Sequence, residues 1–242
     1  MRFAICLSNF GSYADPHAAV RVAQAAETAG WDGFFMWDHL AFVWGPPSAD
    51  PWVTLAAVAG ATEKLTLGTA VTPLARRRPQ VVAQQLTTLE ALNGAPVVLG
   101  AGLGGNEKEF TAFGEDFDPH RRATLLESGL KTVRDYWQGP VWIGGNGAAA
   151  LRRAARWDGW VANSVATDGM TMTPNELAQK VEQIGRGAGF AVACNGYSSA
   201  HDRALCEAYA EAGATWWFEN AHDRRFTPDE LLARVAAGPA SA

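Results

Sequence analysis

The chain has 242 residues, of which 48% are hydrophobic and 19% charged, and its formal net charge is −5. This length and apolar content suffice for one large core, and the negative charge argues against binding to nucleic acid or to an anionic membrane surface. The cysteines (Cys6, Cys194 and Cys206) show no CxxC or zinc-site spacing, so we expect core residues and no metal site.

The amino-terminal residues enter an apolar, strand-like run directly, and no apolar stretch in the sequence is long enough to span a membrane. We therefore expect no signal peptide, no membrane segment and a cytoplasmic protein.

Strand-like and helix-like segments alternate along the whole sequence. Short runs rich in β-branched and aromatic residues predict strands at 3–8, 33–38, 65–71, 96–102, 141–145, 159–164, 190–197 and 215–219. Amphipathic patterns predict helices at 16–29, 51–61, 79–92, 120–137, 148–157, 173–187, 200–212 and 228–237. Asp-Pro pairs at 15–16 and 50–51 place a capping side chain before a proline in the first helical turn.

Eight strand–helix units in a chain of this length predict a (β/α)8 TIM barrel, with an open doubly wound sheet as the alternative. No linker or repeat divides the chain, so we expect a single domain over residues 1–242, with a frayed tail at 238–242. In such a barrel the chemistry lies where strands end and the following loops begin.

Asp38-His39 follows the second predicted strand and is the strongest candidate for acid–base chemistry, because histidine titrates near neutral pH. The alternative is a capping aspartate beside a rim histidine. The remaining histidines are expected at the surface: His17, His120, His201 and His222. They form no HxH or HExxH pattern, which argues against a metallohydrolase.

The stretch 141–148 reads as a strand, a Gly-Gly-Asn-Gly turn and the start of a helix. Backbone N–H groups at such a turn can bind a phosphate, and glycine allows close approach. The alternative is an ordinary turn between strand and helix. The predicted cradle comprises Gly144, Gly145, Asn146, Gly147 and Ala148.

Other strand ends give weaker signals. Small residues at 70–72 leave room for a flat ligand. The arginines at 76–78 either bind anionic groups or form a solvated loop, and charge alone favours the solvated loop. A GxGxxG pattern at 100–105 imitates a dinucleotide fingerprint, but no amphipathic helix follows it immediately. Glu107 and Glu109 are candidates for catalysis, but carboxylates that enter a helix more often serve the helix dipole.

Four stretches in order carry a resemblance to a known family: AETAGWDGFFMWDHL at 26–40, TLGTAVTPLARRRP at 66–79, LGAGLGGNEKEFTAFG at 99–114 and VWIGGNGAAALRRAARWDGW at 141–160. With them, the chain resembles the bacterial luciferase-like superfamily of flavin- and deazaflavin-dependent oxidoreductases. The resemblance implies a (β/α)8 barrel with the ring of FMN or of the deazaflavin coenzyme F420 across the carboxyl ends of the strands.

The resemblance also implies roles for particular residues. A non-prolyl cis peptide behind the ring falls at Ala70–Val71, the cofactor phosphate falls at the 144–148 turn, and Asp38-His39 falls near the reactive edge of the ring. The implied cofactor-binding set is Asn9, Asp38, Ala70, Val71, Thr72, Gly102, Gly104, Gly144, Gly145, Asn146, Gly147 and Ala148.

The chain departs from the family in two places. A stretch of a few dozen residues that family members carry is missing before Pro140, so a lid would come from other loops such as 42–48. The acid of the sugar-phosphate dehydrogenase branch falls at Gly105, which argues against that activity.

The sequence therefore predicts an oxidoreductase that moves a hydride to or from a small organic substrate, with F420 favoured slightly over FMN. His39 and Asp38 are the predicted catalytic residues. The predicted substrate pocket consists of Trp37, Phe42, Trp44, Trp52 and Glu219, and its aromatics suggest an apolar substrate.

Three alternatives remain open: an FMN-dependent monooxygenase, a flavin-binding protein without activity, and a non-flavin barrel hydrolase. The family also implies a homodimer that associates through the helices after the second and third strands.

Overall fold

The computed structural model describes residues 1–166 and 169–240. Its main sheet is parallel and is built from β1 (Arg2–Leu7), β2 (Gly33–Met36), β3 (Thr66–Thr69), β4 (Thr72–Pro73), β5 (Val97–Gly102), β6 (Val141–Gly144), β7 (Gly159–Ala162), β10 (Ala191–Gly196) and β11 (Trp216–Ala221). A separate antiparallel pair is formed by β8 (Val165–Ala166) and β9 (Gly169–Met170).

The sheet closes on itself. Its order is β3-β2-β1-β11-β10-β7-β6-β5-β4, and β3 pairs in addition with β5. The two-residue β4 comes directly after β3, and both pair with β5. Counted as one strand, they give the closed sheet the eight strands predicted from the sequence. The (β/α)8 barrel is confirmed, because in an open sheet β3 and β5 would lie near opposite edges and could not pair with each other.

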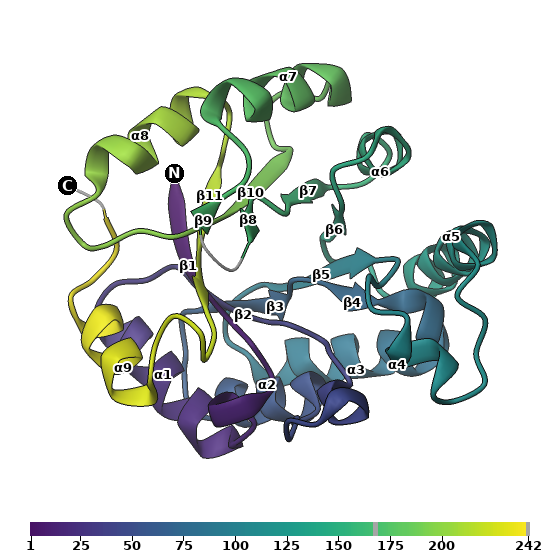
Figure 1. Ribbon diagram of the computed structural model, residues 1–242, viewed down its shortest axis with the longest axis horizontal. Helices are drawn as coiled ribbons and strands as arrows, with labels where there is room; N and C mark the ends of the chain where they lie inside the picture. The colour runs from purple at the N-terminus through teal and green to yellow at the C-terminus, as the bar shows by residue number, and fades with distance from the viewer. Residues whose placement is uncertain (167–168, 241–242) are drawn as a thin grey trace.

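Helices surround the barrel (Figure 1). They are α1 (Pro16–Thr28), α2 (Pro51–Ala59), α3 (Pro79–Leu92), α4 (Lys108–Thr111), α5 (Pro119–Tyr136), α6 (Ala148–Ala154), α7 (Pro174–Ile184), α8 (Arg203–Glu211) and α9 (Pro228–Ala236), with the 3-10 turns η1 (Gly11–Tyr13), η2 (Ala41–Trp44) and η3 (Leu74–Arg76). The side chains of Asp15 and Asp50 accept hydrogen bonds from the first turns of α1 and α2, as the sequence predicts. In the described part of the chain, no helix combines the length and apolarity needed to cross a membrane.

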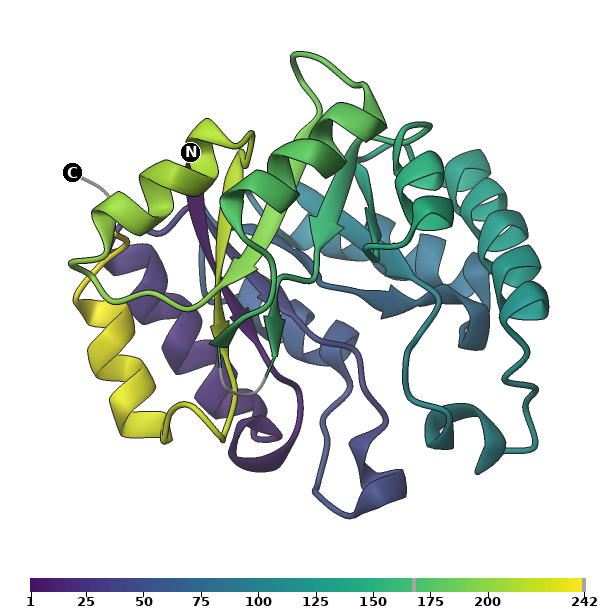
Figure 2. The same ribbon diagram turned by 45° about the horizontal axis from the view of Figure 1, so that its top comes forward.

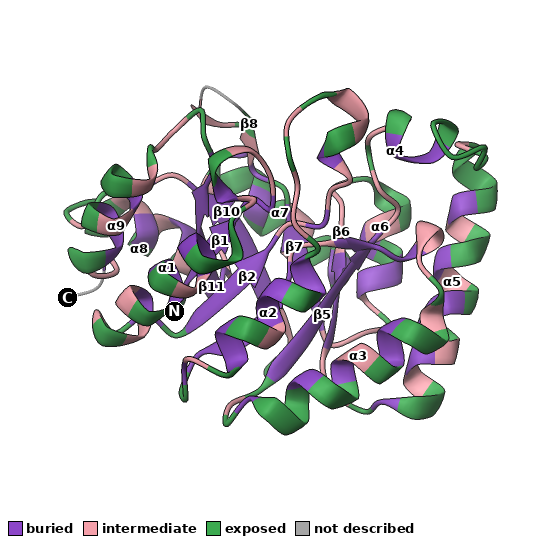
Figure 3. Ribbon diagram, turned by 90° about the horizontal axis from the view of Figure 1, so that it is seen from below, coloured by how far each residue is buried: buried purple, intermediate pink, exposed green. Residues whose placement is uncertain are grey.

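The apolar side chains form two layers separated by the strands. Inside the barrel, Phe35, Trp142, Trp216 and Phe218 pack with smaller residues. A larger cluster fills the space between strands and helices. Because side chains alternate between the two faces of a strand, neighbouring residues belong to different layers. Figure 3 shows the buried strands enclosed by helices with exposed outer faces.

The expectation of a frayed tail is wrong for residues 238–240. Ala240 is buried in the outer core, and the carbonyl of Gly238 accepts a hydrogen bond from Arg234. Residues 241 and 242 lie outside the described residues.

Candidate functional site

Two long loops lie at the same end of the barrel, beyond the carboxyl ends of the strands (Figure 2). One follows β2 and contains η2, and the other follows β5 and contains α4. These loops contact each other, and Phe42 and Phe113 meet with ring centroids 6.1 Å apart. They bring together residues that are distant in the sequence.

His39 lies in the loop after β2 and contacts the loop after β5. Its Nδ1 atom is 2.5 Å from a carboxylate oxygen of Glu109, whose side chain is fully excluded from solvent, whereas one third of the His39 side chain (33%) is exposed. Because Nδ1 is held by the carboxylate, Nε2 is the ring nitrogen available to a ligand. Glu109 lies in the first turn of α4, as expected, but its carboxylate also binds His39, so this geometry favours the catalytic alternative.

Asp38 holds two arginines. Arg77 binds both of its carboxylate oxygens at 2.7 Å, and Arg76 donates to one of them at 3.1 Å. Burial, which would lower the pKa of Arg77, is outweighed by the nearby Asp38 and Asp50, so this pKa is raised. The prediction that Asp38 takes part in catalysis is not supported by this geometry, because its carboxylate is occupied within the chain.

Arg76 also connects Asp38 to Glu109. Its Nε atom lies 3.3 Å from the second carboxylate oxygen of Glu109, close enough for an ion pair but not aligned as a hydrogen bond. The side chain of Arg76 is only 3% exposed. The expectation that residues 76–78 form a solvated loop is thus wrong for Arg76 and Arg77. They form part of a buried charge network beneath His39.

Asn9 positions the backbone of His39. Its amide donates to the carbonyls of His39 and Ala49, both at 2.8 Å, and accepts from the His39 N–H at 3.1 Å. Both amide hydrogens are used in these contacts. The structure therefore shows Asn9 holding the backbone of His39, and its role in cofactor binding stays a prediction.

Two of the predicted pocket aromatics flank His39. Trp37 and Trp44 each lie 5.9 Å from its imidazole, and Phe10 completes the cluster at 5.8 Å. Phe42 is 53% exposed and turns toward Phe113 at the rim. Trp52 is buried in the core between strands and helices, so its assignment to the pocket is wrong.

Glu219 is also misplaced by the sequence prediction. Its side chain points away from the barrel interior and forms ion pairs with Arg225 and Arg234, with an additional hydrogen bond from Ser198. The neighbouring inward positions on β11 are Phe218 and Asn220. Glu219 therefore belongs to a buried ionic cluster outside the barrel.

The peptide bond between Ala70 and Val71 is cis, as the resemblance implied. The Val71 side chain occupies space that glycines leave open. A Cβ atom would lie 2.7 Å from Val71 on Gly102 and 2.9 Å from it on Gly144. Gly102 and Gly144 therefore make room for Val71, a contact that the sequence did not reveal.

Two further residues predicted to bind the cofactor, Thr72 and Gly104, form hydrogen bonds within the chain. Thr72 donates to the Thr69 hydroxyl at 3.1 Å. Gly104 has a φ of 80° and accepts a hydrogen bond from Arg122.

The 144–148 turn has the shape predicted from its glycines. Gly145 has a φ of 119°, a conformation that favours glycine, and Gly147 caps α6 without any side-chain hydrogen bond. Asn146 is tied to the backbone of Asn163, and the Lys180 ammonium donates to the Asn146 carbonyl at 3.2 Å. Lys180, which the sequence did not single out, adds a positive charge beside the turn.

His222, expected at the surface, is buried. It is 7% exposed, and its Nε2 atom lies 2.9 Å from the Tyr197 hydroxyl. Burial and the charges of Arg225 and Arg224 lower its pKa. Within residues 1–166 and 169–240, no group of His, Cys, Asp and Glu is arranged to hold a metal ion, and the three cysteines are buried and free.

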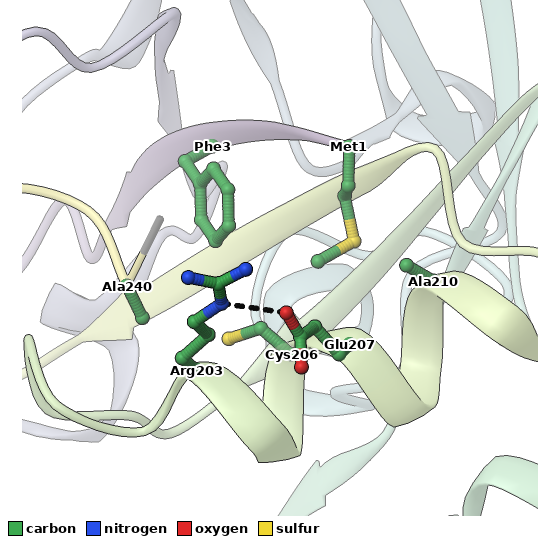
Figure 4. Close-up of a pocket in the computed structure, with 7 residues that line it drawn as sticks. All are labelled: Met1, Phe3, Arg203, Cys206, Glu207, Ala210 and Ala240. Atoms are coloured by element: carbon green, nitrogen blue, oxygen red, sulfur yellow. Dashed lines mark hydrogen bonds and ion pairs between the residues drawn. The ribbon is translucent and has the colours of Figure 1, made fainter. Parts of the chain in front are cut away.

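A hollow of about 190 Å³ lies between the start of β1 and α8, on the outer side of the barrel strands (Figure 4). It is lined by Met1 and Phe3 at the start of β1 and by residues of α8, where Arg203 and Glu207 form an exposed pair. It is thus separate from the cluster around His39.

The sequence matches a family profile over nearly its whole length and matches known proteins over part of it. Residues 1–239 match the profile of the luciferase-like monooxygenase family. The F420-dependent glucose-6-phosphate dehydrogenase of Nakamurella multipartita is 31% identical over 208 residues, which cover 71% of this chain and 60% of that protein. The F420-dependent hydroxymycolic acid dehydrogenase of Mycobacterium tuberculosis is 32% identical over 175 residues, 59% of this chain and 48% of that protein. The matches thus span about half to three fifths of the length of these relatives.

Solved structures share the fold. An F420-dependent secondary alcohol dehydrogenase in complex with an F420-acetone adduct superposes with a TM-score of 0.75 at 17% identity, covering 98% of each chain. The monooxygenase RslO1 from Streptomyces bottropensis superposes with a TM-score of 0.74 at 16% identity, covering 97% of this chain and 96% of the other. From the profile match, the barrel and the cis peptide together, the chain belongs to the luciferase-like monooxygenase family.

Proposed function

We propose that this protein is an oxidoreductase that uses coenzyme F420 to transfer a hydride to or from a small organic substrate. The observation that carries the proposal is the His39–Glu109 pair, which lies at the same end of the barrel as the glycine turn. The names of the relatives favour F420 over FMN, since both curated relatives described above are F420-dependent dehydrogenases.

The residues present fit such a cofactor. The turn from Gly145 to Ala148 offers backbone N–H groups to a phosphate, with Lys180 adding a positive charge nearby. Val71, packed against Gly102 and Gly144, supplies an apolar surface for a flat ring. A bound deazaflavin would supply the hydride-accepting or hydride-donating carbon.

His39 performs the proton chemistry in this proposal. Its Nε2 atom accepts a proton from a substrate hydroxyl during oxidation, or returns one during reduction. Glu109 fixes the tautomer of the ring and balances the positive charge that His39 gains, as a carboxylate does for a catalytic histidine elsewhere. Trp37, Trp44 and Phe10 flank the imidazole and give the site apolar walls.

A second candidate is an FMN-dependent monooxygenase, which the similarity to RslO1 favours. Titration with FMN and with F420 separately, followed by tryptophan fluorescence, distinguishes the two. Saturable binding of F420 alone supports hydride transfer. Binding of FMN alone, with substrate-dependent oxygen uptake, would replace it with oxygenation. If neither binds, the cofactor proposal fails.

His39→Ala tests whether the bound cofactor is used. An enzyme loses turnover in this variant and retains the cofactor, whereas a non-catalytic flavin-binding protein has no turnover to lose. His201→Ala, a change at an exposed histidine, is the matched control.

We also propose a cytoplasmic homodimer. Apolar side chains exposed on α2 and α3 (Val53, Val81 and Leu92) support an interface at these helices. Free cysteines are in keeping with a reducing compartment.

A further inference from the structure

Three neighbouring strands end in polar side chains that point into the barrel. The strands are β1, β11 and β10, which lie side by side in the sheet. On them, Cys6, Phe218 and Ala193 belong to the inner cluster. Two residues further along, Ser8, Asn220 and Asn195 face the same interior, because alternate residues of a strand share a face.

These three side chains are buried, and each has one polar atom without a hydrogen-bond partner among the described residues. Ser8 is 0%, Asn195 7% and Asn220 2% exposed. Among the described residues, the Ser8 hydroxyl oxygen and the Oδ1 atoms of both asparagines have no hydrogen-bond partner. Buried polar atoms are normally paired, because an unpaired one destabilises the folded state. Asn9, at the same end of the barrel, has its amide fully engaged.

The three residues are continuous with the site around His39. Two positions beyond Asn195 and Asn220, Tyr197 and His222 are joined by a hydrogen bond of 2.9 Å. The His222 ring lies 5.7 Å from Trp37, which in turn lies 5.9 Å from His39. Trp37 therefore links His39 to His222, and it packs against the inner cluster that contains Cys6, Ala193 and Phe218.

We infer that Ser8, Asn195 and Asn220 form a polar subsite that binds a second hydroxyl of the substrate while the reacting carbon lies at His39. Free acceptor atoms require a hydrogen-bond donor, which a hydroxyl supplies. The inference rests on the proposed oxidoreductase function and deepens it. The substrate class is a diol or polyol, or its carbonyl counterpart, in place of the apolar substrate suggested by the aromatic residues alone.

The stability of the unliganded protein gives a first test. Ser8→Ala, Asn195→Leu and Asn220→Leu are expected to leave the melting temperature unchanged or to raise it, because they remove unpaired polar atoms. Asn9→Leu is the matched control and is expected to lower it. If the three variants lose as much stability as Asn9→Leu, their amides and hydroxyl have structural partners and the inference is overturned. Asn220→Ala, a smaller change, serves if the leucine variant does not fold.

Ligand binding gives the second test. Linear diols of two to eight carbons and the mono-alcohols of the same lengths are titrated against the protein, with and without F420, following tryptophan fluorescence. We expect at least one diol to bind about tenfold more tightly than its mono-alcohol, and Asn220→Leu to abolish that difference. No preference for any diol would overturn the inference.

F420 titration of the same variants separates the possible failures. Unchanged F420 affinity is expected for the three variants. Weakened F420 binding would assign the polar atoms to the cofactor and overturn the inference. If the unaltered protein binds neither F420 nor FMN, the proposed function fails, while the stability comparison and the diol titration still decide the subsite.

Discussion

The Nδ1 atom of His39 and the carboxylate of Glu109 lie 2.5 Å apart, although 70 residues separate them in the sequence. The carboxylate is fully buried, while the histidine remains partly open to solvent. A partly exposed imidazole held by a buried acceptor has one nitrogen fixed and the other free. This arrangement suits a group that exchanges protons with a bound molecule.

Replacing Glu109 tests whether it supports His39. Glu109→Gln removes the negative charge with little change of shape, so we expect kcat to fall about 100-fold with little change in cofactor affinity. Glu107→Gln changes an exposed residue two positions away and should leave kcat and cofactor affinity unchanged. The measurement is steady-state turnover beside a cofactor titration. A kcat for Glu109→Gln within twofold of the unaltered protein would contradict the assigned role.

Asp38 should act mainly on stability. Asp38→Asn leaves Arg76 and Arg77 without their shared counter-ion in a buried setting, so we expect the free energy of unfolding to fall by about 3–5 kcal/mol. Asp116→Asn breaks a 3.6 Å pair with Arg121 at an exposed site and should change it by less than about 1 kcal/mol. Urea unfolding measures both. Equal effects of the two variants would show that the network beneath His39 is not a stabilising one.

The contact between Val71 and the glycines predicts a steric effect. Gly102→Ala places a Cβ atom 2.7 Å from Val71, and we expect a loss of about 1–3 kcal/mol in stability together with weaker cofactor binding. Gly105→Ala is the matched control, because nothing lies within 4 Å of its added Cβ atom. Adding Val71→Ala to Gly102→Ala should restore part of the lost stability. A double variant no more stable than Gly102→Ala would argue against this contact as the cause.

The ion pairs of Glu127 predict a dependence of stability on pH. Burial alone would raise the pKa of Glu127, but its bonds to Arg153 and Arg156 outweigh burial and lower the pKa from 4.5. Since the folded state holds the proton less tightly than the unfolded state, the stabilisation is present above pH 4.5 and is lost as the pH falls through the lower folded value. Between pH 7 and about pH 3, the free energy of unfolding should therefore fall less steeply for Glu127→Gln than for the unaltered protein. An unchanged slope would contradict the assignment, and Glu211→Gln controls for the loss of one surface charge.

The order of helices and strands could be predicted from the sequence, because it depends on local patterns. Units of a short apolar strand followed by an amphipathic helix repeat eight times, and eight parallel units of this length close as a barrel. The glycine turn at 144–148 could be located for the same reason, since its conformation depends on residues that adjoin in the chain. The cis peptide at Ala70–Val71 followed from the family resemblance.

The direction and partners of the site residues could be decided only by the tertiary structure. Glu219 and Asn220 are neighbours, yet one points outward to Arg234 and the other inward, and a shift of one residue in the strand reverses the assignment. Glu109 becomes the partner of His39 because two loops from distant parts of the chain meet at the same end of the barrel. Charge pairing and burial depend on distances through space, and local sequence patterns carry no information about those distances.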